Sequence, residues 1–581
     1  MKEHNDNERN ENMNENIEDQ SEDIKKQNGS NSRRIKIIGI GVAALVLVVL
    51  AIAAAVTLYN PHIIVPVDYR TIQSAIDAAE DGDVIVVEPG VYYEQIDFLG
   101  KEITLRSTDP EDADVVTETI IDGRRRDSVV TFQNGESNEA VLKGFTIAGG
   151  IGTRDTLVHE YEGEEYVEDS YYGGGIYIAG ESSPTITLNL IEGNDIDHNN
   201  SGGGGIAVLD NSNPVIVKNT IVNNTSYSGG GIYTWKSNPI IENNFIRGND
   251  ASNYGAGIFI DFESNPRIRG NNIQNNSSTS GGGVAIFNSD PLLSGNTINN
   301  NKAIWFGGGV AVFDGAPTIE DNDISNNAAT NNGGGIAVAE GSTPEIINNN
   351  IEKNRTEENG GGLAIIEGSE PVIIDNKIAE NVVRLGGGGL FINESSPIID
   401  GNELIGNVVE NDGGGMVIMH NSAPTVTANI IDNNFAGRYG GAVVIGEDSS
   451  PVFEDNTISS NTASFAGGGF FIQRSSVTLE RNIISDNVAE EQSGGGIIIV
   501  ANSLAVIRGN EFTGNISSEF GGGLVVYDNS VVDLTENVFI ENEAGDEGGA
   551  FISIGDDASI ELSDPDDNTY EDNIPEDIDE E

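Results

Sequence analysis

The chain has 581 residues, a net charge of −64 at pH 7 and no cysteine. The absence of thiols excludes disulfides, cysteine-ligated zinc and thiol nucleophiles. The acidic surplus excludes a nucleic-acid partner, because it repels phosphate.

The first 59 residues divide into a polar part and an apolar part. Residues 1–36 are predicted to be a disordered cytoplasmic tail, since they hold few apolar side chains. Residues 37–59 carry no charge and are long enough to cross a membrane as one helix. Basic residues precede this segment, so the N-terminus is expected in the cytoplasm and the rest outside it.

A cleaved signal peptide is the alternative interpretation of the same segment. The run Ala53-Ala54-Ala55 has the small residues of a cleavage site. With either interpretation the part after residue 60 is exported. The predicted location is therefore the cell membrane, with a single-pass anchor at 37–59 and the remainder outside the cytoplasm.

Residues 63–172 are expected to form an N-terminal cap and the first coils of a solenoid. Ile72, Ala75, Ile76 and Ala79 follow the spacing of a short amphipathic helix, and Asp68 or Thr71 would cap its start. Such a helix would cover the open apolar end of a repeat array. Residues 151–172 interrupt this region as a charged, tyrosine-rich insertion loop.

A glycine-rich triplet recurs through residues 173–562. After a first step of 30 residues, each triplet follows the previous one by 26 or 27 residues; the triplets end at 175, 205, 231, 257, 283, 309, 335, 362, 389, 415, 442, 469, 496, 523 and 550. Three short apolar strands per repeat predict coils that stack in parallel, about 4.8 Å apart. The general rule for parallel crossovers makes the coil right-handed. The remaining residues, 563–581, are predicted to be an acidic tail.

Two asparagines occupy fixed places in nearly every repeat, five residues apart, from Asn189 and Asn194 to Asn537 and Asn542. Stacked coils would align each position in a column, where amides can hydrogen-bond to their own kind. Asparagine also tolerates left-handed backbone, so these residues are expected to form the turns themselves. We interpret both columns as structural.

The region before the array resembles exported β-helix proteins of the pectin-lyase-like superfamily. The resemblance rests on DYRTIQSAIDAAEDGDVIVVEPGVYYE, ITLRS, TIIDG and LKGFTIAGG, followed by the GGGI and SSPTI repeats, and covers residues 63–560. It implies a right-handed parallel β-helix with an N-terminal capping helix. It implies no single activity, because the superfamily includes lyases, hydrolases, epimerases and adhesins.

No catalytic series is recognisable in the chain. The motif series shared by the superfamily's hydrolases is absent, and the array has few basic residues to serve a lyase. The weak catalytic candidates are His159 in the insertion and Asp195, Asp197 and His198 in the overlong coil that follows. No metal site and no cofactor are predicted, although calcium binding remains an alternative.

The candidate binding surface is an apolar row on the outward face of the strands that follow the triplets. We call it the outer stripe; the binding candidates among its aromatic members are Tyr177, Tyr233, Trp235, Phe259, Phe287 and Phe313. Beside it runs a carboxylate-rich row that includes Asp210, Asp314 and Glu340. An exposed stripe would suit sugar rings, which stack on aromatic faces and need hydrogen-bond acceptors. Alternatively, neighbouring turns cover the stripe and it is part of the core.

The sequence favours a membrane-anchored β-helix that binds or adheres to an extracellular polysaccharide or other surface polymer without catalysis. The alternative is a polysaccharide lyase or glycoside hydrolase acting on an extracellular glycan. The pattern specifies neither the ligand nor the oligomeric state.

Overall fold

The computed structural model describes residues 62–161, 164–555, 558–562, 567–575 and 578–580. The predicted cytoplasmic tail and apolar anchor, residues 1–36 and 37–59, lie outside the described residues. Within the described part, no helix has both the length and the apolar character needed to cross a membrane.

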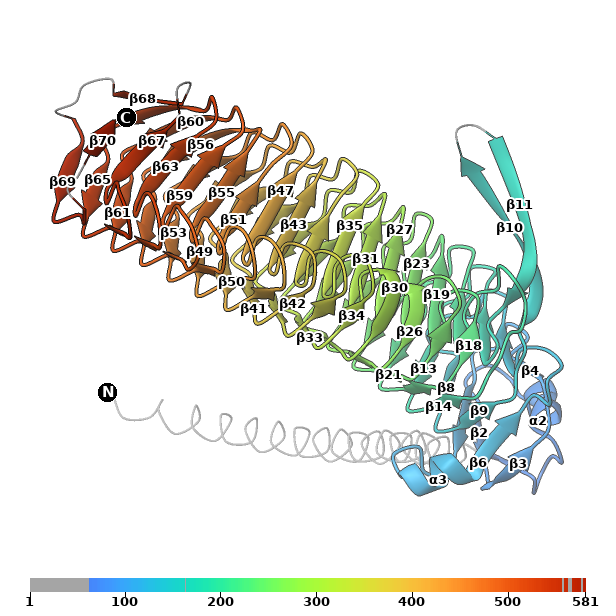
Figure 1. Cartoon of the computed structure of the whole chain (residues 1–581). Helices are drawn as coiled ribbons and strands as arrows, with labels where there is room; N and C mark the ends of the chain where they lie inside the picture. The colour runs from blue at the N-terminus through green and yellow to red at the C-terminus, as the bar shows by residue number, and fades with distance from the viewer. Residues whose placement is uncertain (1–61, 162–163, 556–557, 563–566, 576–577, 581) are drawn as a thin grey trace, which may run out of the picture. The chain divides into compact units, whose positions relative to one another are not determined.

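The described residues from Ile63 onward form a parallel β-helix, seen in Figure 1 as successive coils that run from the end carrying α2 (Ile72–Ala78) to the end carrying β69 (Thr569–Glu571). One coil contains β19 (Ile232–Trp235), β20 (Ile240–Glu242), β21 (Phe245–Arg247) and β22 (Asp250–Ala251). Each strand pairs in parallel with its counterpart in the next coil; Ile232 of β19, for example, lies opposite Ile258 of β23 (Ile258–Asp261). The stacked strands form sheets of 18 and 19 strands, a third ladder from β3 (Gly90–Tyr92) to β69 (Thr569–Glu571), and a 13-stranded sheet.

The strand after each glycine triplet belongs to the 18-stranded sheet, which we call the triplet sheet. Its strands in the region of interest are β12 (Ile176–Ile178), β15 (Ile206–Val208), β19, β23, β27 (Val284–Phe287), β31 (Val310–Phe313), β35 (Ile336–Ala339), β39 (Leu363–Ile365), β43 (Leu390–Asn393), β47 (Met416–Met419), β51 (Val443–Ile445) and β55 (Phe470–Gln473).

The sequence predicted three strands per coil and missed a fourth. The fourth strands, from β18 (Thr225–Ser226) to β66 (Glu543–Ala544), are mostly two residues long, too short for an alternating apolar pattern to be visible. Their second residue is buried and usually small; the series is Ser226, Ala251, Ser278, Ala303, Ala329, Thr356, Val383, Val409, Ala436, Ala463, Ala489, Ser517 and Ala544.

The glycine triplet packs directly against this fourth strand. A Cβ at Gly308, the middle residue of one triplet, would lie 2.6 Å from the backbone of Ala328, in the fourth strand that ends the same coil. The first residue of a triplet makes a turn instead, as at Gly229, whose φ of +62° lies in the left-handed region that glycine adopts without cost. Close approach and turn geometry therefore explain why the triplet recurs.

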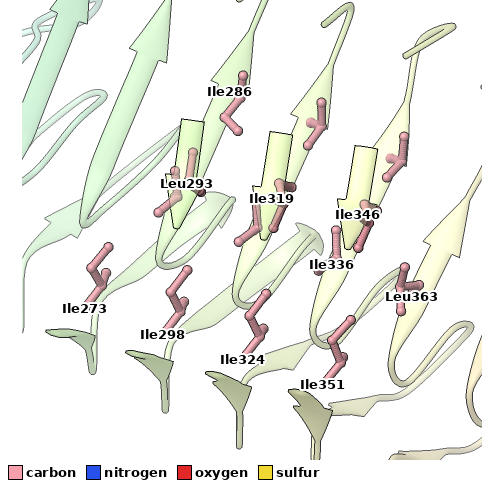
Figure 2. Close-up of a cluster of buried hydrophobic side chains, with 14 of the residues drawn as sticks. Ile273, Ile286, Leu293, Ile298, Ile319, Ile324, Ile336, Ile346, Ile351 and Leu363 are labelled. Carbon is pink, nitrogen blue, oxygen red and sulfur yellow. The ribbon is translucent and has the colours of Figure 1, made fainter. Parts of the chain in front are cut away.

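The interior of the coil is filled by aliphatic side chains stacked on their counterparts. Figure 2 shows side chains from three sheets converging on one core: Ile286 and Ile336 come from the triplet sheet, Ile319 and Ile346 from the next strand, and Ile324 from the one after. All five are fully buried. Burial of this kind contributes about 1.5–3 kcal/mol for each aliphatic side chain, so every added coil extends a continuous core.

Both asparagine columns form the predicted ladders. The side-chain oxygen of Asn402 accepts hydrogen bonds from the backbone N–H of Asn376 (2.9 Å) and from its Nδ2 (3.0 Å). The Nδ2 of Asn376 also donates to the carbonyl oxygen of Ile346, at 2.7 Å. The expectation that these asparagines adopt left-handed backbone is wrong, because that conformation belongs to the residue before each of them, such as Asp375 with a φ of 54°. The ladder amides instead satisfy buried backbone groups.

The N-terminal end is closed by the predicted helix, α2 (Ile72–Ala78), and Thr71 caps it by accepting from the Ser74 N–H. Its residues Ile72 and Ile76 are fully buried in the main core. A second short helix, α3 (Ala113–Glu118), was not predicted.

Two other segments differ from their predicted form. The insertion at 151–172 is an antiparallel hairpin of β10 (Thr153–Tyr161) and β11 (Glu164–Tyr172) rather than a loop. Part of the predicted acidic tail adds one more coil, since Asn568 and Asn573 extend the two ladders and β69 pairs with β65 (Val538–Ile540).

Candidate functional site

The outer stripe is covered, which was the second of the two alternatives drawn from the sequence. Tyr177, Tyr233, Trp235 and Phe313 are each 4% exposed and Phe259 is 5% exposed, whereas Phe287 is half-buried. The covering side chains come from the residue just before a triplet, where Tyr172, Tyr254, Phe306, Tyr439 and Phe520 occur. Most of the stripe therefore belongs to a second layer of apolar packing outside the main core.

Tyr254 shows how one covering residue spans several coils. Its ring stacks on Phe259 of its own coil, with centroids 5.5 Å apart. It also packs against Phe287 of the next coil at 6.5 Å and edge-on against Phe313 of the coil after that at 5.9 Å. Such aromatic pairs contribute about 0.5–1.5 kcal/mol beyond their buried area, so this cluster holds three coils together.

The hairpin β10–β11 is bound to the triplet sheet through its own side chains and backbone. Leu157 is buried in the aromatic cluster, and the Tyr177 hydroxyl donates to Asp155 at 2.5 Å. The ammonium group of Lys236 donates to the carbonyl oxygen of Val158 at 3.2 Å. These contacts place the carboxylate-rich hairpin beside the aromatic part of the outer stripe.

A cavity of about 300 Å³ opens where the hairpin, the covering turns and the triplet sheet meet. We call it the aromatic cavity. Its lining includes Glu168, Tyr227, Tyr233, Tyr254, Phe259, Asp261, Phe262, Phe287 and Asp314, together with Asn200, Ser201, Ser228, Asn253 and Asn288. Ring faces, carboxylates and amides thus share one wall, the combination typical of a small-molecule site.

Asp261 is the polar centre of this wall. It lies in the triplet sheet opposite Trp235 on one side and Phe287 on the other. The Tyr233 hydroxyl donates to its Oδ2 at 2.9 Å. This bond fixes the carboxylate in an otherwise aromatic row.

Burial and negative charge both act on the tyrosines around the cavity. Burial, followed by the charge of Asp261, raises the pKa of Tyr233 well above its usual value. Burial also raises the pKa of Tyr254, and the carboxylate of Glu340 adds to the effect. Each hydroxyl therefore stays protonated at neutral pH and can act as a hydrogen-bond donor.

A second cavity of about 410 Å³ lies farther along the same sheet, and we call it the Arg438 cavity. Its lining includes Phe391, Val417, Met419, Tyr439, Val444 and Phe471 with the charged pair Asp412 and Arg438. The Asp412 carboxylate and the Arg438 guanidinium are 4.0 Å apart. Burial raises the pKa of Asp412, although Arg438 and the Tyr439 N–H oppose that shift.

The weak catalytic candidates lie elsewhere. Asp195 forms an ion pair with Arg125 at 3.0 Å, and Asp197 is exposed. The exposed His198 stacks on Tyr171 of the hairpin, with centroids 4.2 Å apart. His159 lies in β10, and its side chain is outside the described residues. Asp195, Asp197 and His198, whose side chains are described, do not line the aromatic cavity.

In the described part of the chain, no group of three or more His, Asp or Glu side chains is arranged to hold a metal ion.

A family model for the right-handed β-helix region matches residues 166–323, 294–445 and 425–575, which together exceed half of the chain. The protein belongs to this β-helix family. The fold resemblance to pectin-lyase-like β-helix proteins is thereby confirmed.

Two solved structures are similar to this β-helix at low identity. One is a PL6 family alginate lyase, AlyGC, with 12% identity and a TM-score of 0.21 over 86% of this chain and 98% of that one. The other is the tailspike gp61 of Pseudomonas phage phi297, with 11% identity and a TM-score of 0.25 over 84% and 76%. No curated protein matches the sequence.

The β-helix brings three of the six predicted binding residues, Tyr233, Phe259 and Phe287, into the aromatic cavity. The other three, Tyr177, Trp235 and Phe313, are buried beside it and do not line it. Sequence analysis missed Tyr254 and Asp261. Their signals were an aromatic residue just before a triplet and a single carboxylate in an apolar column.

Proposed function

We propose that this β-helix protein binds a carbohydrate polymer outside the cytoplasm, with the aromatic cavity as its binding site and without catalysis. The apolar segment 37–59 would anchor it to the cell membrane. The partner would be an extracellular polysaccharide or another surface polymer that carries sugar rings.

The observation that carries the proposal is the combination of ring faces and acceptors in one cavity of suitable size. Phe287 and Tyr254 are half-buried, so their surfaces are only partly used by packing. Asp261, Asp314 and Asn288 supply acceptors close to those rings. Sugars need both, because their C–H faces stack on aromatic rings and their hydroxyl groups donate hydrogen bonds.

Binding can be tested with the full chain and a panel of neutral, amino and acidic oligosaccharides, measured by calorimetry. We expect at least one sugar to bind, and Phe287→Ala to weaken that binding by about 1–3 kcal/mol through the lost stacking surface. Phe435→Ala is the matched control. Phe435 is an exposed phenylalanine in β50 (Phe435–Ala436) of the 13-stranded sheet, outside the lining of the aromatic cavity. No binding by any sugar, or equal binding by wild type and Phe287→Ala, would contradict the proposal.

The alternative function is a polysaccharide lyase or glycoside hydrolase. It is favoured by one feature, the presence of Glu168, Asp261 and Asp314 in the same cavity, since glycoside hydrolysis uses two carboxylates as acid and base. The same panel, incubated with and without calcium and analysed for shortened products, separates the two functions. Turnover of any oligosaccharide would replace the binding proposal by the enzymatic one.

A further inference from the structure

One column of side chains on the 13-stranded sheet changes its character halfway along the β-helix. Its members are the first residues of the fourth strands, which face outward because the second residues are buried. In the first six of these strands the members are polar, charged or small: Thr225, Asp250, Ser277, Lys302, Ala328 and Arg355. In the next six they are apolar except for one threonine, and we call this part the apolar column: Val382, Val408, Phe435, Thr462, Val488 and Ile516.

The apolar column lies at the surface. Four of its members, Val382, Val408, Phe435 and Ile516, are 37% to 45% exposed, and the other two are half-buried. Parallel pairing joins each member directly to the next, so the column is continuous over five steps, about 24 Å. Isolated exposed apolar residues are ordinary, but a continuous row of them is typical of an interaction surface.

Residues of opposite charge occupy the two ends of the apolar column. Arg355 pairs with its first member, and Glu543 pairs with its last. Two residues before each of these come Lys353 and Glu541, which occupy equivalent left-handed turn positions. All four charged residues are exposed. One end of the column is therefore flanked by basic side chains and the other by acidic ones.

The basic residues already form ion pairs within the chain, and these pairs leave them largely in contact with water. Arg355 contacts Glu357 at 3.1 Å, and Lys353 contacts Glu352 at 3.2 Å and Glu380 at 3.7 Å. The side chains of Arg355 and Lys353 are still 68% and 48% exposed. Exposed pairs of this kind contribute about 0–1 kcal/mol, so both cations can take a second carboxylate at little cost.

We propose that two copies of this protein pair face to face through their apolar columns, running in opposite directions. A two-fold axis that crosses the column between Phe435 and Thr462 brings these two residues of different copies together. The same axis matches the other members in pairs: Val408 with Val488, Val382 with Ile516, and Arg355 with Glu543. The surface is thus complementary to itself, as a symmetric dimer requires. The proposal is independent of sugar binding.

Charge selects this arrangement over the one in which both copies run in the same direction. That arrangement would place Arg355 opposite Arg355 and Glu543 opposite Glu543, whereas the antiparallel one places each basic end opposite an acidic end. Glu410 and Glu490 would face each other beside the column, at exposed positions where water screens them. The net charge of −64 acts at longer range, and salt at 0.15 M screens it beyond about 8 Å.

The first test traps the pairing with engineered thiols, since the chain has no cysteine. Val408 and Val488 of one chain are three coils, about 14 Å, apart, which is too far for a disulfide within the chain. The full-length variants Val408→Cys and Val488→Cys are mixed in a mild non-ionic detergent at about 0.15 M salt and oxidised. We expect a disulfide-linked dimer from the mixture on a non-reducing gel, and mostly monomer from each variant alone.

Ser277→Cys mixed with Val408→Cys is the matched control. Ser277 is an exposed member of the same column, but it lies outside the apolar part. We therefore expect little cross-linking from this mixture.

The second test exchanges the charges at the ends of the column. Arg355→Glu and Glu543→Arg each bring like charges together, so each should weaken dimerisation of the full chain about tenfold in sedimentation experiments. The two changes alter the net charge in opposite directions, so a general charge effect cannot weaken both. An equal mixture of the two variants restores opposite charges at both ends and should dimerise like the wild type.

Each test has outcomes that would overturn the proposal. Cross-linking of Val408→Cys alone, as readily as in the mixture with Val488→Cys, would overturn the antiparallel arrangement. Cross-linking that is absent from that mixture, or equally strong with Ser277→Cys, would overturn pairing through this face. A mixture of Arg355→Glu and Glu543→Arg that dimerises no better than either variant alone would do the same. None of these outcomes affects the proposed binding of sugars.

Discussion

The aromatic cavity and the Arg438 cavity are built on the same frame and differ in charge. In each, the tyrosine before a glycine triplet packs on a phenylalanine of the triplet sheet: Tyr254 on Phe259 at 5.5 Å, and Tyr439 on Phe471 at 4.3 Å. The described lining of the first cavity includes the carboxylates of Glu168, Asp261 and Asp314, whereas in the second Arg438 lies opposite Asp412.

This difference shows which positions of the repeat are fixed and which are free. A triplet of small residues, both asparagine columns and buried inward-facing apolar residues occur around both cavities, because they hold the coils together. Charge changes at turn positions outside that set, such as those of Asp314 and Arg438. A β-helix can therefore vary the chemistry along its surface while its core stays constant.

The largest expected effect tests whether the phenylalanines of the triplet sheet that line the two cavities are part of the packed structure. Phe259 is 5% exposed and Phe471 is 8% exposed, so Phe259→Ala and Phe471→Ala should each lower the free energy of unfolding by about 3–5 kcal/mol. Urea denaturation of the full chain measures both. Phe435→Ala, at a residue 37% exposed, is the control and should cost less than about 1 kcal/mol. If Phe259→Ala or Phe471→Ala were as stable as this control, the phenylalanine concerned would line a surface groove without contributing to the packing.

A smaller effect is expected in the ladder that continues between the two cavities. Asn376→Ala removes the hydrogen bonds to Asn402 and Ile346 and leaves buried partners unsatisfied, which should cost about 1–3 kcal/mol. Thr330→Ala, at an exposed turn position, should change the free energy of unfolding by less than about 0.5 kcal/mol. Thermal melts compare the two variants. Equal shifts in Tm would mean that the shared frame does not depend on the asparagines.

The smallest effect concerns the charged pair that distinguishes the Arg438 cavity. Burial raises the folded-state pKa of Asp412 above 3.8, so its protonated form is favoured by folding. That contribution is present below pH 3.8 and is lost as the pH rises through the raised pKa. Relative to Asp412→Asn, the wild type should therefore lose stability as the pH rises from about 4 through the raised pKa, by less than about 1 kcal/mol.

Arg438→Met provides the check on that sign. Arg438 lowers the pKa of Asp412, so its removal should move the loss to higher pH. Denaturation curves at a series of pH values measure the shift. A wild type that gains stability over Asp412→Asn as the pH rises would show that the Arg438 charge outweighs burial.

Most of the fold was predictable because its determinants repeat. The columns that include Asn376 and Asn381, and the core column that includes Ile346, each show one physical requirement many times over. The fourth strand escaped prediction because a pair such as Asp250 and Ala251 is too short to carry a pattern. Its trace was indirect, since a Cβ at the middle glycine of a triplet, as at Gly308, would collide with the backbone of that strand.

The candidate site was less predictable, because it depends on side chains that reach across coils. Tyr254 contacts Phe313, which is two coils later in the chain, and no periodicity records such a contact. The sequence located the aromatic row correctly and left open whether it was exposed. The hairpin that brings Glu168 to the cavity is a single insertion, so no repeat could indicate where it packs.

The strand pairing between coils has a consequence for how the two cavities can be spaced. Phe287 of β27 and Phe391 of β43 are separated by the steps through β31, β35 and β39, four coils in all, or about 19 Å. Because a partial coil would break every ladder, this spacing can change only in whole steps of about 4.8 Å. Duplication or loss of one repeat between the two cavities would therefore change their separation by one coil, about 4.8 Å.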